Sequence, residues 1–585
     1  MFKVVWFPRV FVPSLSIAIG LLGAAACGSA EPTPAPTPTL APVATATTAV
    51  ATPTPTATAT PTPAPVAKPK RGGILKEQAS EDPNGFDAQN ATTAAWTIHT
   101  GKLYNMLLWN PDGKSIAPDA VESYSISADG KVWTFKLRGD VRFQSYPDNP
   151  GPRDGTLMTA ADAVYSLKKI MGLVDQVASA RSGWMREFVD LDRPDEGVAV
   201  IDERTLQVYL TQPFPDLAKI LILDNSVIYP EGTTRDMLVK RPYGSGAFKL
   251  KGFQRGSMWT YERDPAYFKA DEVYLNEIRE VILQGGRAIT NVAFLTGQTD
   301  IGRDLPTADN RSLYRNMVAE GKIVTNNVPG TCTVQGVYMN STKPPFNNPK
   351  LRKAVHLALD RKGYIETVYS GDAVPVTYVP SGKLPWFLTE EEIWKLPGYR
   401  QPKDQDLAEA KRIMAEEAPQ GLQLTLYARD SGNYPAMAEF NAGNLKKIGI
   451  DVTISLAPSS VLFPRLTAWN YEIASYCMTM ITITAAEQFG GYYITGASRN
   501  WLAFNNREID EMYPRMVAAE GADQAAMIRK MEQIMWDYIP YAPMAASYDS
   551  FNYYSFVKDY PLASPANGFS YYSVNRLSQV WRSDV

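Results

Sequence analysis

The stretch that decides the fold class is GLQLTLYARDSGNYPAMAEFNAGNLKKIGIDVTISLA, residues 421–457. Leu422, Leu424 and Leu426 alternate with other residues, which predicts a strand, and Ile450 to Leu456 alternates in the same way. Between them an amphipathic stretch, 435–448, ends at Gly449 and predicts a helix. Strand, helix and strand within about 35 residues form a βαβ unit, whose strands run parallel. The C-terminal half is therefore expected to contain a partly parallel sheet.

Two further patterns extend this prediction. Trp133, Phe135 and Leu137 alternate with polar residues directly after the turn signal Asp129-Gly130, which is typical of a hairpin strand. A helix that starts near Asp404 or Asp406 is expected before the βαβ unit, with Ala408, Ala410 and Ile413 along it. The sequence thus predicts an α/β fold with mixed sheets.

Length and composition limit the possible functions. The chain has 585 residues, and because single cores stop growing at roughly 250 to 300 residues, two or more lobes are expected. A net charge of −3 without a long basic run argues against a nucleic-acid partner. Two histidines and three cysteines supply few metal ligands, so neither a metal site nor a cofactor is expected.

The N-terminus has the features of an export signal. Lys3 and Arg9 precede an apolar run from Phe11 to Leu22, as in a signal peptide. The segment LGAAACG, residues 22–28, resembles a bacterial lipobox, which implies cleavage after residue 26 and a lipid on Cys27. An ordinary secretory cleavage after an alanine and an uncleaved anchor helix are the alternatives. The protein is therefore expected outside the cytoplasm, anchored to the cell membrane by this lipid.

The next segment predicts a stalk. Residues 31–70 consist almost wholly of Ala, Pro, Thr and Val, a composition that stays extended and cannot form a core. A lipid-anchored stalk over 27–70 explains this segment better than a generic disordered tail, which is the alternative.

Several segments of the remaining chain resemble one protein family in order and spacing. They include RGGIL (71–75), DGKVWTFKLR (129–138), MTAADAVYSL (158–167), YGSGAF (243–248) and NSTKPPFNNPKLRKAVHLALDR (340–361). Each is a weak signal alone, but together they resemble family 5 of the extracellular solute-binding proteins, which includes the dipeptide, oligopeptide and nickel receptors of ABC importers.

The resemblance implies a fold and a domain organisation. It implies a two-lobed periplasmic-binding-protein clamshell with a large lobe, an accessory subdomain, mixed sheets and a two-strand hinge. The expected boundaries are 1–26 for the lipoprotein signal peptide, 27–70 for the stalk, 71–110 with 241–328 and 558–585 for lobe I, 111–240 for the accessory subdomain of lobe I, and 329–557 for lobe II.

The resemblance also implies a function. A monomeric receptor of this family would capture a small solute between its lobes and deliver it to the permease subunits of an ABC-type importer. In peptide-binding relatives, a cysteine just before the first strand of the second lobe is bonded to another beside the ligand, and Cys332 and Cys477 fall at the matching places. The resemblance therefore implies a disulfide between them, and two buried free thiols are the alternative.

The sequence departs from the peptide-binding relatives at the expected ligand site. Those relatives place an aspartate two residues after the second cysteine to hold a peptide ammonium, whereas this chain has Thr479, and Thr92 stands near the place of an early glutamate. Burying an unpaired ammonium costs several kcal/mol. A neutral, apolar or sugar-like ligand is therefore expected, and an oligopeptide or dipeptide is the alternative. The expected ligand-binding residues are Thr92, Trp96, Trp184, Gln335, Tyr476, Met478, Thr479, Met480, Trp501 and Tyr548.

An enzyme is not expected. No nucleophile elbow, zinc-protease motif or phosphate-binding loop occurs in the sequence. His99 is isolated, and His356 falls in a predicted helix over Arg352–Arg361, where a structural role is expected. A glycosidase-like enzyme with a carboxylate pair, and a sensor or adhesin that has lost transport, are the alternatives from other classes.

Overall fold

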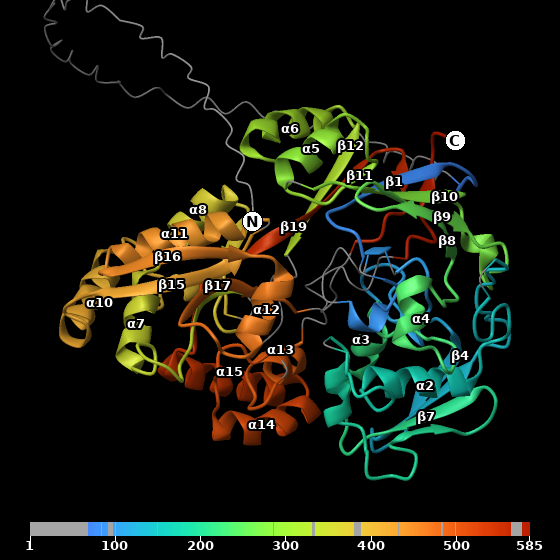
Figure 1. Cartoon of the computed structure of the whole chain (residues 1–585), viewed down its shortest axis with the longest axis horizontal. Coiled ribbons are helices and arrows are strands. Elements are labelled where there is room, and N and C mark those ends of the chain that lie inside the picture. Colours follow the sequence, from blue (N-terminus) through green and yellow to red (C-terminus); the bar gives the residue numbers. More distant parts are fainter. Residues whose placement is uncertain are drawn as a thin grey trace, which may run out of the picture. The chain divides into compact units, whose positions relative to one another are not determined.

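The predicted βαβ unit is present in the computed structural model, shown in Figure 1. Strand β15 (Leu422–Arg429) and strand β16 (Ile450–Ala457) run parallel, joined by α11 (Tyr434–Lys446). They belong to a five-stranded sheet of order β16-β15-β17-β13-β18. In it β17 pairs parallel with β15 and antiparallel with β13. The other strands are β13 (Val334–Met339), β17 (Ile473–Met478) and β18 (Tyr541–Pro543).

The structure describes residues 68–585 except for 84, 92–97, 100, 149, 180, 285, 330–333, 380–387, 431, 481–483, 498 and 563–575. Cys27, the stalk up to residue 67, Thr92, Trp96 and Cys332 lie outside the described residues. The described residues from 68 onward belong to one compact unit.

Helices cover this sheet because their apolar residues share a core with it. Leu426 and Ala428 of β15 are buried against Met437, Ala438 and Leu445 of α11. Helices α7 (Pro349–Ala358) and α10 (Asp404–Glu417) contribute to the same core, so the helix predicted near Asp404 is confirmed.

A second sheet joins segments that are far apart in sequence. Its order is β1-β10-β9-β8, and β1 runs parallel to β10. Trp259, Tyr261 and Ile278 form the centre of its apolar core. Its strands are β1 (Ile74–Ala79), β8 (Phe248–Gln254), β9 (Met258–Arg263) and β10 (Glu277–Ile282).

A third sheet, of order β4-β5-β7-β6, contains the predicted hairpin. Trp133, Phe135 and Leu137 all point to its buried side, as the alternation predicts. Helix α2 (Ala160–Ile170) packs on this sheet and begins with a capping box between Thr159 and Asp162. The strands are β4 (Val121–Ile126), β5 (Val132–Leu137), β6 (Val198–Val200) and β7 (Thr205–Tyr209).

Two long strands connect the second sheet with the five-stranded sheet. Strand β12 (Ile323–Pro329) precedes β13, and β19 (Ala545–Tyr554) follows β18; the two pair antiparallel. They form the two-strand connection of the fold, with β11 (Ile301–Gly302) and β14 (Ala373–Pro375) also pairing with β19.

The helix predicted over Arg352–Arg361 is wrong in its extent. Helix α7 ends at Ala358, and α8 (Arg361–Tyr369) begins after it. The Asp360 carboxylate accepts a hydrogen bond from the Gly363 amide, at 3.1 Å, and caps α8. A side chain that caps a new helix competes with continuing the old one, so the chain turns at Leu359 and Asp360.

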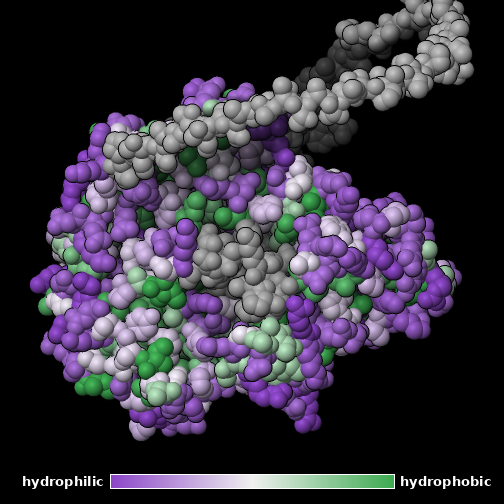
Figure 2. Space-filling view, turned by 180° about the vertical axis from the view of Figure 1, so that it is seen from behind, coloured by the Kyte–Doolittle hydropathy of each residue, from purple (hydrophilic) through white to green (hydrophobic). Residues whose placement is uncertain are grey.

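The remaining elements are helices of 4 to 18 residues, 3-10 turns and two small strand pairs. The molecular face in Figure 2 is mainly hydrophilic, with apolar residues in separate patches. Within the described part of the chain, no helix combines the length and apolarity needed to cross a membrane. The helices are α3 (Leu217–Leu221), α4 (Arg235–Lys240), α5 (Arg287–Leu295), α6 (Arg311–Ala319), α9 (Glu390–Ile393), α12 (Ser459–Thr467), α13 (Ala485–Tyr492), α14 (Arg507–Ala518) and α15 (Gly521–Tyr538), with 3-10 turns at Ala88–Asn90, Gly183–Glu187, Ala270–Glu272 and Ala308–Asn310, and the strands are β2 (Leu108–Trp109), β3 (Ala117–Pro118), β20 (Val557–Lys558) and β21 (Trp581–Arg582).

Candidate functional site

The candidate site lies where two parallel strands of the five-stranded sheet end. Strands β15 and β17 run in the same direction and end at Arg429 and Met478. In open α/β sheets, ligands bind outside the carboxyl ends of the strands. The predicted site residues Tyr476, Met478, Thr479 and Met480 all belong to this edge.

Aromatic rings gather at this edge. The ring of Tyr476 stacks on that of Tyr434, with centroids 4.9 Å apart and an interplanar angle of 10°. The Trp501 ring packs edge-on against the rings of Tyr476 and Tyr492, with centroids 5.7 and 5.9 Å apart. Pairs of this geometry are each worth about 0.5–1.5 kcal/mol beyond their buried area. We call Tyr434, Phe463, Tyr476, Tyr492 and Trp501 the aromatic cluster.

Three arginines bring positive charge to the aromatic cluster. The Arg429 guanidinium lies 5.8 Å from the centroid of the Tyr434 ring. Burial raises the pKa of Tyr476 to about 12, and the charges of Arg429 and Arg181 oppose that rise. Arg499 donates hydrogen bonds to the Tyr492 hydroxyl, at 2.7 Å, and to the Thr479 carbonyl, at 3.2 Å.

Other predicted residues lie in the protein core beside this edge. The Gln335 side-chain oxygen accepts a hydrogen bond from Tyr364, at 2.7 Å, and the Met478 sulfur accepts one from Tyr493, at 3.3 Å. Both residues are at most 1% exposed, and Met480 is equally buried. These contacts are those of packed core residues, and their ligand contacts stay a prediction.

Trp184 lies in the 3-10 turn Gly183–Glu187, away from the rings of the aromatic cluster that contact one another. Its ring meets Phe188 at 6.3 Å and Phe214 at 5.6 Å, both edge-on. Phe188 in turn lies 6.1 Å from Tyr513 of α14, between ring centroids. Tyr548 lies apart from this group, in β19, where its amide donates to the Asp372 carbonyl.

Cys477 lies within the candidate site. Its sulfur is 3.1 Å from the Tyr434 hydroxyl. The expected partner, Cys332, is outside the described residues, so the disulfide between the two stays a prediction.

Sequence reasoning missed the arginines around the aromatic cluster. A signal existed for Arg429, because it follows Tyr427 by two residues in a predicted strand and so shares its face. Arg181 and Arg499 gave no such signal, because they reach the cluster from irregular segments.

His99 has buried partners that the sequence did not indicate. Its Nδ1 lies 3.0 Å from the Tyr261 hydroxyl and contacts the Glu280 carboxylate. Lys102 joins Glu280 and Glu77 at 2.6 and 2.9 Å in the same buried network. Burial alone would raise the pKa of Glu280, but the neighbouring His99 and Lys102 hold it below its usual value. The sequence could not show this because the partners come from distant strands.

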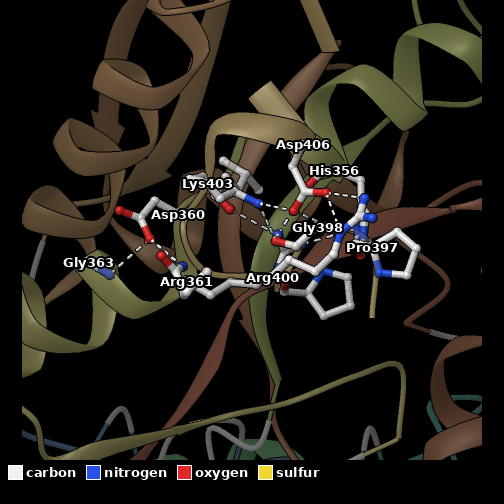
Figure 3. A network of polar contacts seen from close by, with 12 residues as sticks. His356, Asp360, Arg361, Gly363, Pro397, Gly398, Arg400, Lys403 and Asp406 are labelled. Carbon is white, nitrogen blue, oxygen red and sulfur yellow. Dashed lines mark hydrogen bonds and ion pairs between the residues drawn. The ribbon is translucent and has the colours of Figure 1, made fainter. Parts of the chain in front are cut away.

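His356 lies in a second buried network, shown in Figure 3. Its Nε2 is 3.1 Å from the Pro397 carbonyl oxygen, and its Nδ1 is 3.1 Å from Arg361. Burial and the Arg361 charge hold the pKa of His356 well below its usual value, so the ring is neutral. Among the described residues, no group of three His, Cys, Asp or Glu side chains is placed to hold a metal ion.

A cavity of about 740 Å³ lies between α7 and α15. Leu357 and Trp536 line it, and Lys350 and Lys353 stand at its rim, where they pair with Glu417 and Glu409. Of the predicted ligand-binding residues that the structure describes, none lines this cavity.

Comparison with known proteins identifies the class. The family profile "Bacterial extracellular solute-binding proteins, family 5 Middle" matches residues 115–500. This chain belongs to that family, whose members are solute-binding proteins of ABC importers.

The individual relatives are binding proteins too. The chain is 25% identical over 489 residues to the periplasmic oligopeptide-binding protein OppA of Haemophilus influenzae, covering 78% of this chain and 84% of the relative. It is 24% identical to the probable D,D-dipeptide-binding periplasmic protein DdpA of Escherichia coli, covering 82% and 88%. The Helicobacter pylori protein DppA, solved in complex with the peptide STSA, has the same fold, with a TM-score of 0.73 at 20% identity over 88% of this chain and 98% of that one.

Proposed function

We propose that this protein binds an oligopeptide-like solute at the aromatic cluster and delivers it to the permease of an ABC importer. The observation that carries the proposal is the position of the cluster at the carboxyl edge of β15 and β17, where Tyr476 and Trp501 belong to the same apolar core as Trp184. The peptide class comes from the relatives, which are named for oligopeptides and dipeptides. A peptide is therefore the first candidate ligand, in place of the neutral or sugar-like ligand expected from the sequence.

A two-lobed arrangement supports capture between lobes. We propose the boundaries 71–110 with 241–328 and 558–585 for lobe I, 111–240 for its accessory subdomain, and 329–557 for lobe II. All strands of the third sheet come from the proposed accessory subdomain, and all strands of the five-stranded sheet come from proposed lobe II. The accessory subdomain touches lobe II where the Gln212 side chain donates to the Pro514 carbonyl, at 2.8 Å. A ligand that adds contacts to both sides would favour the closed arrangement.

A lipid anchor at Cys27, after a signal peptide over 1–26 and before a stalk over 27–70, completes the proposal. The sequence pattern LGAAACG supports it. Intact-mass spectrometry of the membrane-extracted protein should give a lipid-modified N-terminus at Cys27. Release of Cys27→Ser into the medium is the second expected result, and an unmodified wild-type N-terminus would contradict the anchor.

We also propose the disulfide between Cys332 and Cys477. Cys332 precedes Val334 by two residues, and Val334 pairs with Met478 across β13 and β17. Two residues span at most about 7 Å, so chain connectivity permits this bond. Non-reducing peptide mapping should recover the two cysteines in one linked peptide pair, and their recovery as separate alkylated thiols would exclude the bond.

The decisive experiment for the ligand class is native mass spectrometry of the purified full-length protein, followed by thermal-shift measurements with tripeptides and neutral oligosaccharides. We expect peptides to raise the melting temperature, because a ligand at 100 times its Kd stabilises the folded state by about 2.7 kcal/mol. Stabilisation by oligosaccharides and not by peptides would contradict the peptide proposal.

A neutral, apolar or sugar-like solute is the second candidate. The segment Tyr476 to Met480 contains no carboxylate that could hold a peptide ammonium. N-acetylated tripeptides separate the two candidates: binding as tight as that of the free-amine peptides would show that the ammonium contributes nothing here.

A further inference from the structure

We infer that the cavity between α7 and α15 is a second binding site. It takes an organic cation with an apolar body, such as an aralkylamine, and holds the ammonium on the Glu532 carboxylate. No residue of the aromatic cluster lines this cavity, so the inference does not depend on the proposed peptide function. Four observations support it.

The first observation is the size and the wall of the cavity. Its volume of about 740 Å³ falls within the range of about 300–1,000 Å³ that is usual for small-molecule sites. Five apolar residues form much of its wall: Leu357 of α7, Leu396 and Pro397 of the loop before α10, Trp536 of α15, and Ile539 directly after that helix. Such a wall is suited to the apolar body of a small ligand.

The second observation is a buried carboxyl group in the same wall. Glu532 of α15 lines the cavity and is 5% exposed. The Thr377 hydroxyl donates a hydrogen bond to it, but Glu532 forms no ion pair with a described residue. Burial accordingly raises the pKa of this carboxyl group to about 7. A buried carboxylate without a counter-charge is costly, and a bound ammonium would remove that cost.

The third observation is the position of Trp536 beside this carboxyl group. Trp536 follows Glu532 by four residues on α15, so the two side chains share one face of the helix. The Trp536 ring packs edge-on against the rings of Tyr378 and His356, with centroids 4.9 and 5.5 Å apart, and it is only partly buried. Indole rings attract cations within about 6 Å. One ammonium group can therefore contact both the carboxylate and the ring.

The fourth observation is that the lysines of the cavity already have counter-charges. The Lys353 ammonium pairs with Glu409 at 2.7 Å, and the Lys350 ammonium pairs with Glu417. Neither glutamate lines the cavity, and an anionic ligand would compete with both of them for the lysines. With Glu532 ionised, the lining and these two glutamates carry three cations and four carboxylates, a net charge of −1: Lys350, Lys353 and Arg529 against Glu409, Glu417, Glu532 and Asp537.

The surroundings of Glu532 make its ionisation a usable signal. His356 stays neutral, because burial and the Arg361 charge hold its pKa well below the usual value. Lysine, arginine, aspartate and tyrosine ordinarily titrate outside the range from pH 6 to 8. These types account for the other titratable groups around Glu532, which are Lys350, Lys353, Tyr378, Tyr399, Tyr493, Arg529 and Asp537. Binding of a cation should therefore follow the charge of Glu532 over this range.

The test uses isothermal titration calorimetry on the full-length protein with three probes of similar shape and different charge: 2-phenylethylamine, 2-phenylethanol and 3-phenylpropanoate. At pH 8 we expect the amine to bind at least 10-fold more tightly than the alcohol and the acid. A change from pH 8 to pH 6 should weaken the amine roughly tenfold and leave the alcohol unchanged, because a carboxyl group with a pKa of about 7 passes from about nine-tenths to about one-tenth ionised.

Glu532→Gln should weaken the amine at least 10-fold at pH 8 and remove its pH dependence, and it should change the affinity for the alcohol by less than 3-fold. Glu409→Gln is the matched control, because Glu409 is also a carboxylate beside the cavity but pairs with Lys353 and does not line it. We expect this control to keep the affinity for the amine within 3-fold and to keep its pH dependence.

Each outcome supports or overturns the inference. Equal affinity for the amine and the alcohol at pH 8, tighter binding of the acid, or no binding of the amine would overturn it, and these comparisons need no folded variant. Displacement of the amine by excess trialanine would place it at the aromatic cluster and overturn the second site, whereas simultaneous binding of the two would support it. A failure of trialanine to bind would contradict only the proposed peptide function.

Discussion

Two arginines, Arg361 and Arg429, lie within the region of the five-stranded sheet and use their guanidinium groups differently. Arg361 is fully buried and donates to the carbonyl oxygens of Pro543, at 2.8 Å, and Gly398, at 2.6 Å, and it lies over the Tyr399 ring at 4.1 Å. Arg429 has a buried Nε without a partner among the described residues. The difference teaches that backbone carbonyls can satisfy the N–H groups of a structural guanidinium. A guanidinium whose N–H groups are not all satisfied is suited to bind a ligand.

The network around Arg361 depends on close packing (Figure 3). His356, whose carbonyl also accepts from Arg361 at 2.9 Å, faces Gly398 on the next loop. Asp406 accepts from the Gly398 amide at 3.0 Å and from Lys403 at 2.9 Å, which fixes that loop. These polar groups therefore find their hydrogen-bond partners inside the protein.

Replacement of Arg361 should cause the largest loss of stability. Arg361→Met leaves several buried carbonyl oxygens without donors, so we expect a loss of about 3–5 kcal/mol of unfolding free energy. Urea unfolding followed by circular dichroism measures this loss. Arg429→Met is the matched control and should change the midpoint little; equal losses in the two variants would contradict the comparison.

Glu532 extends the comparison to a buried carboxyl group. Because of it, the free energy of unfolding should fall by about 3 kcal/mol as the pH rises. Burial raises the pKa of Glu532 to about 7, although Thr377 and nearby backbone groups oppose this. The folded protein therefore binds the proton more tightly than the unfolded chain. Its stabilisation is complete below the unfolded pKa, near 4.3, and is lost as the pH rises through 7.

Unfolding midpoints measured between pH 4.5 and 8 test this effect. The wild-type protein should lose stability as the pH rises, and Glu532→Gln should lose less over the same range. An identical pH dependence in both proteins would show that Glu532 is not the responsible group.

Gly398→Ala should lower the free energy of unfolding by an intermediate amount, about 2–3 kcal/mol. The residue has a φ of +87°, and an added Cβ would lie 2.5 Å from Nε2 of His356. The left-handed conformation alone costs about 1–2 kcal/mol for a non-glycine residue. Gly371→Ala isolates this cost, because Gly371 has a φ of +88° and open space around its Cβ. If both variants lose the same stability, packing against His356 contributes nothing.

Arg429→Gln should have the smallest effect on stability, within about 0.5 kcal/mol of the wild-type value, the range usual for substitutions that remove no packed side chain or ion pair. The reason is that Arg429 makes no ion pair among the described residues whose loss would cost energy. Urea unfolding without ligand measures it. A loss of 2 kcal/mol or more would mean that Arg429 is a structural residue, as Arg361 is.

Much of the fold could be predicted from local patterns. The alternation in 421–457 gave the βαβ unit, and Trp133, Phe135 and Leu137 gave a buried hairpin face, because both signals depend on residues close in sequence. The family followed from the order of short segments. The extent of the helix at Arg352–Arg361 was wrong, because the cap at Asp360 competes with helix continuation.

The candidate site was only partly predictable. Tyr476, Trp501 and Thr479 were expected as ligand-binding residues, and the structure places the two rings in one aromatic cluster with the Thr479 backbone held beside it. Gln335 and Met478 have hydrogen-bond partners in the core, and their ligand contacts stay a prediction.

The sequence by itself determined the α/β class, the family and the neutral character of the segment Tyr476 to Met480. Only the tertiary structure decided which charges act on that segment. Arg181, Arg429 and Arg499 are separated by tens to hundreds of residues, and His99 and Glu280 likewise meet only after folding. Electrostatic interaction depends on distance in space and on burial, neither of which a linear pattern contains.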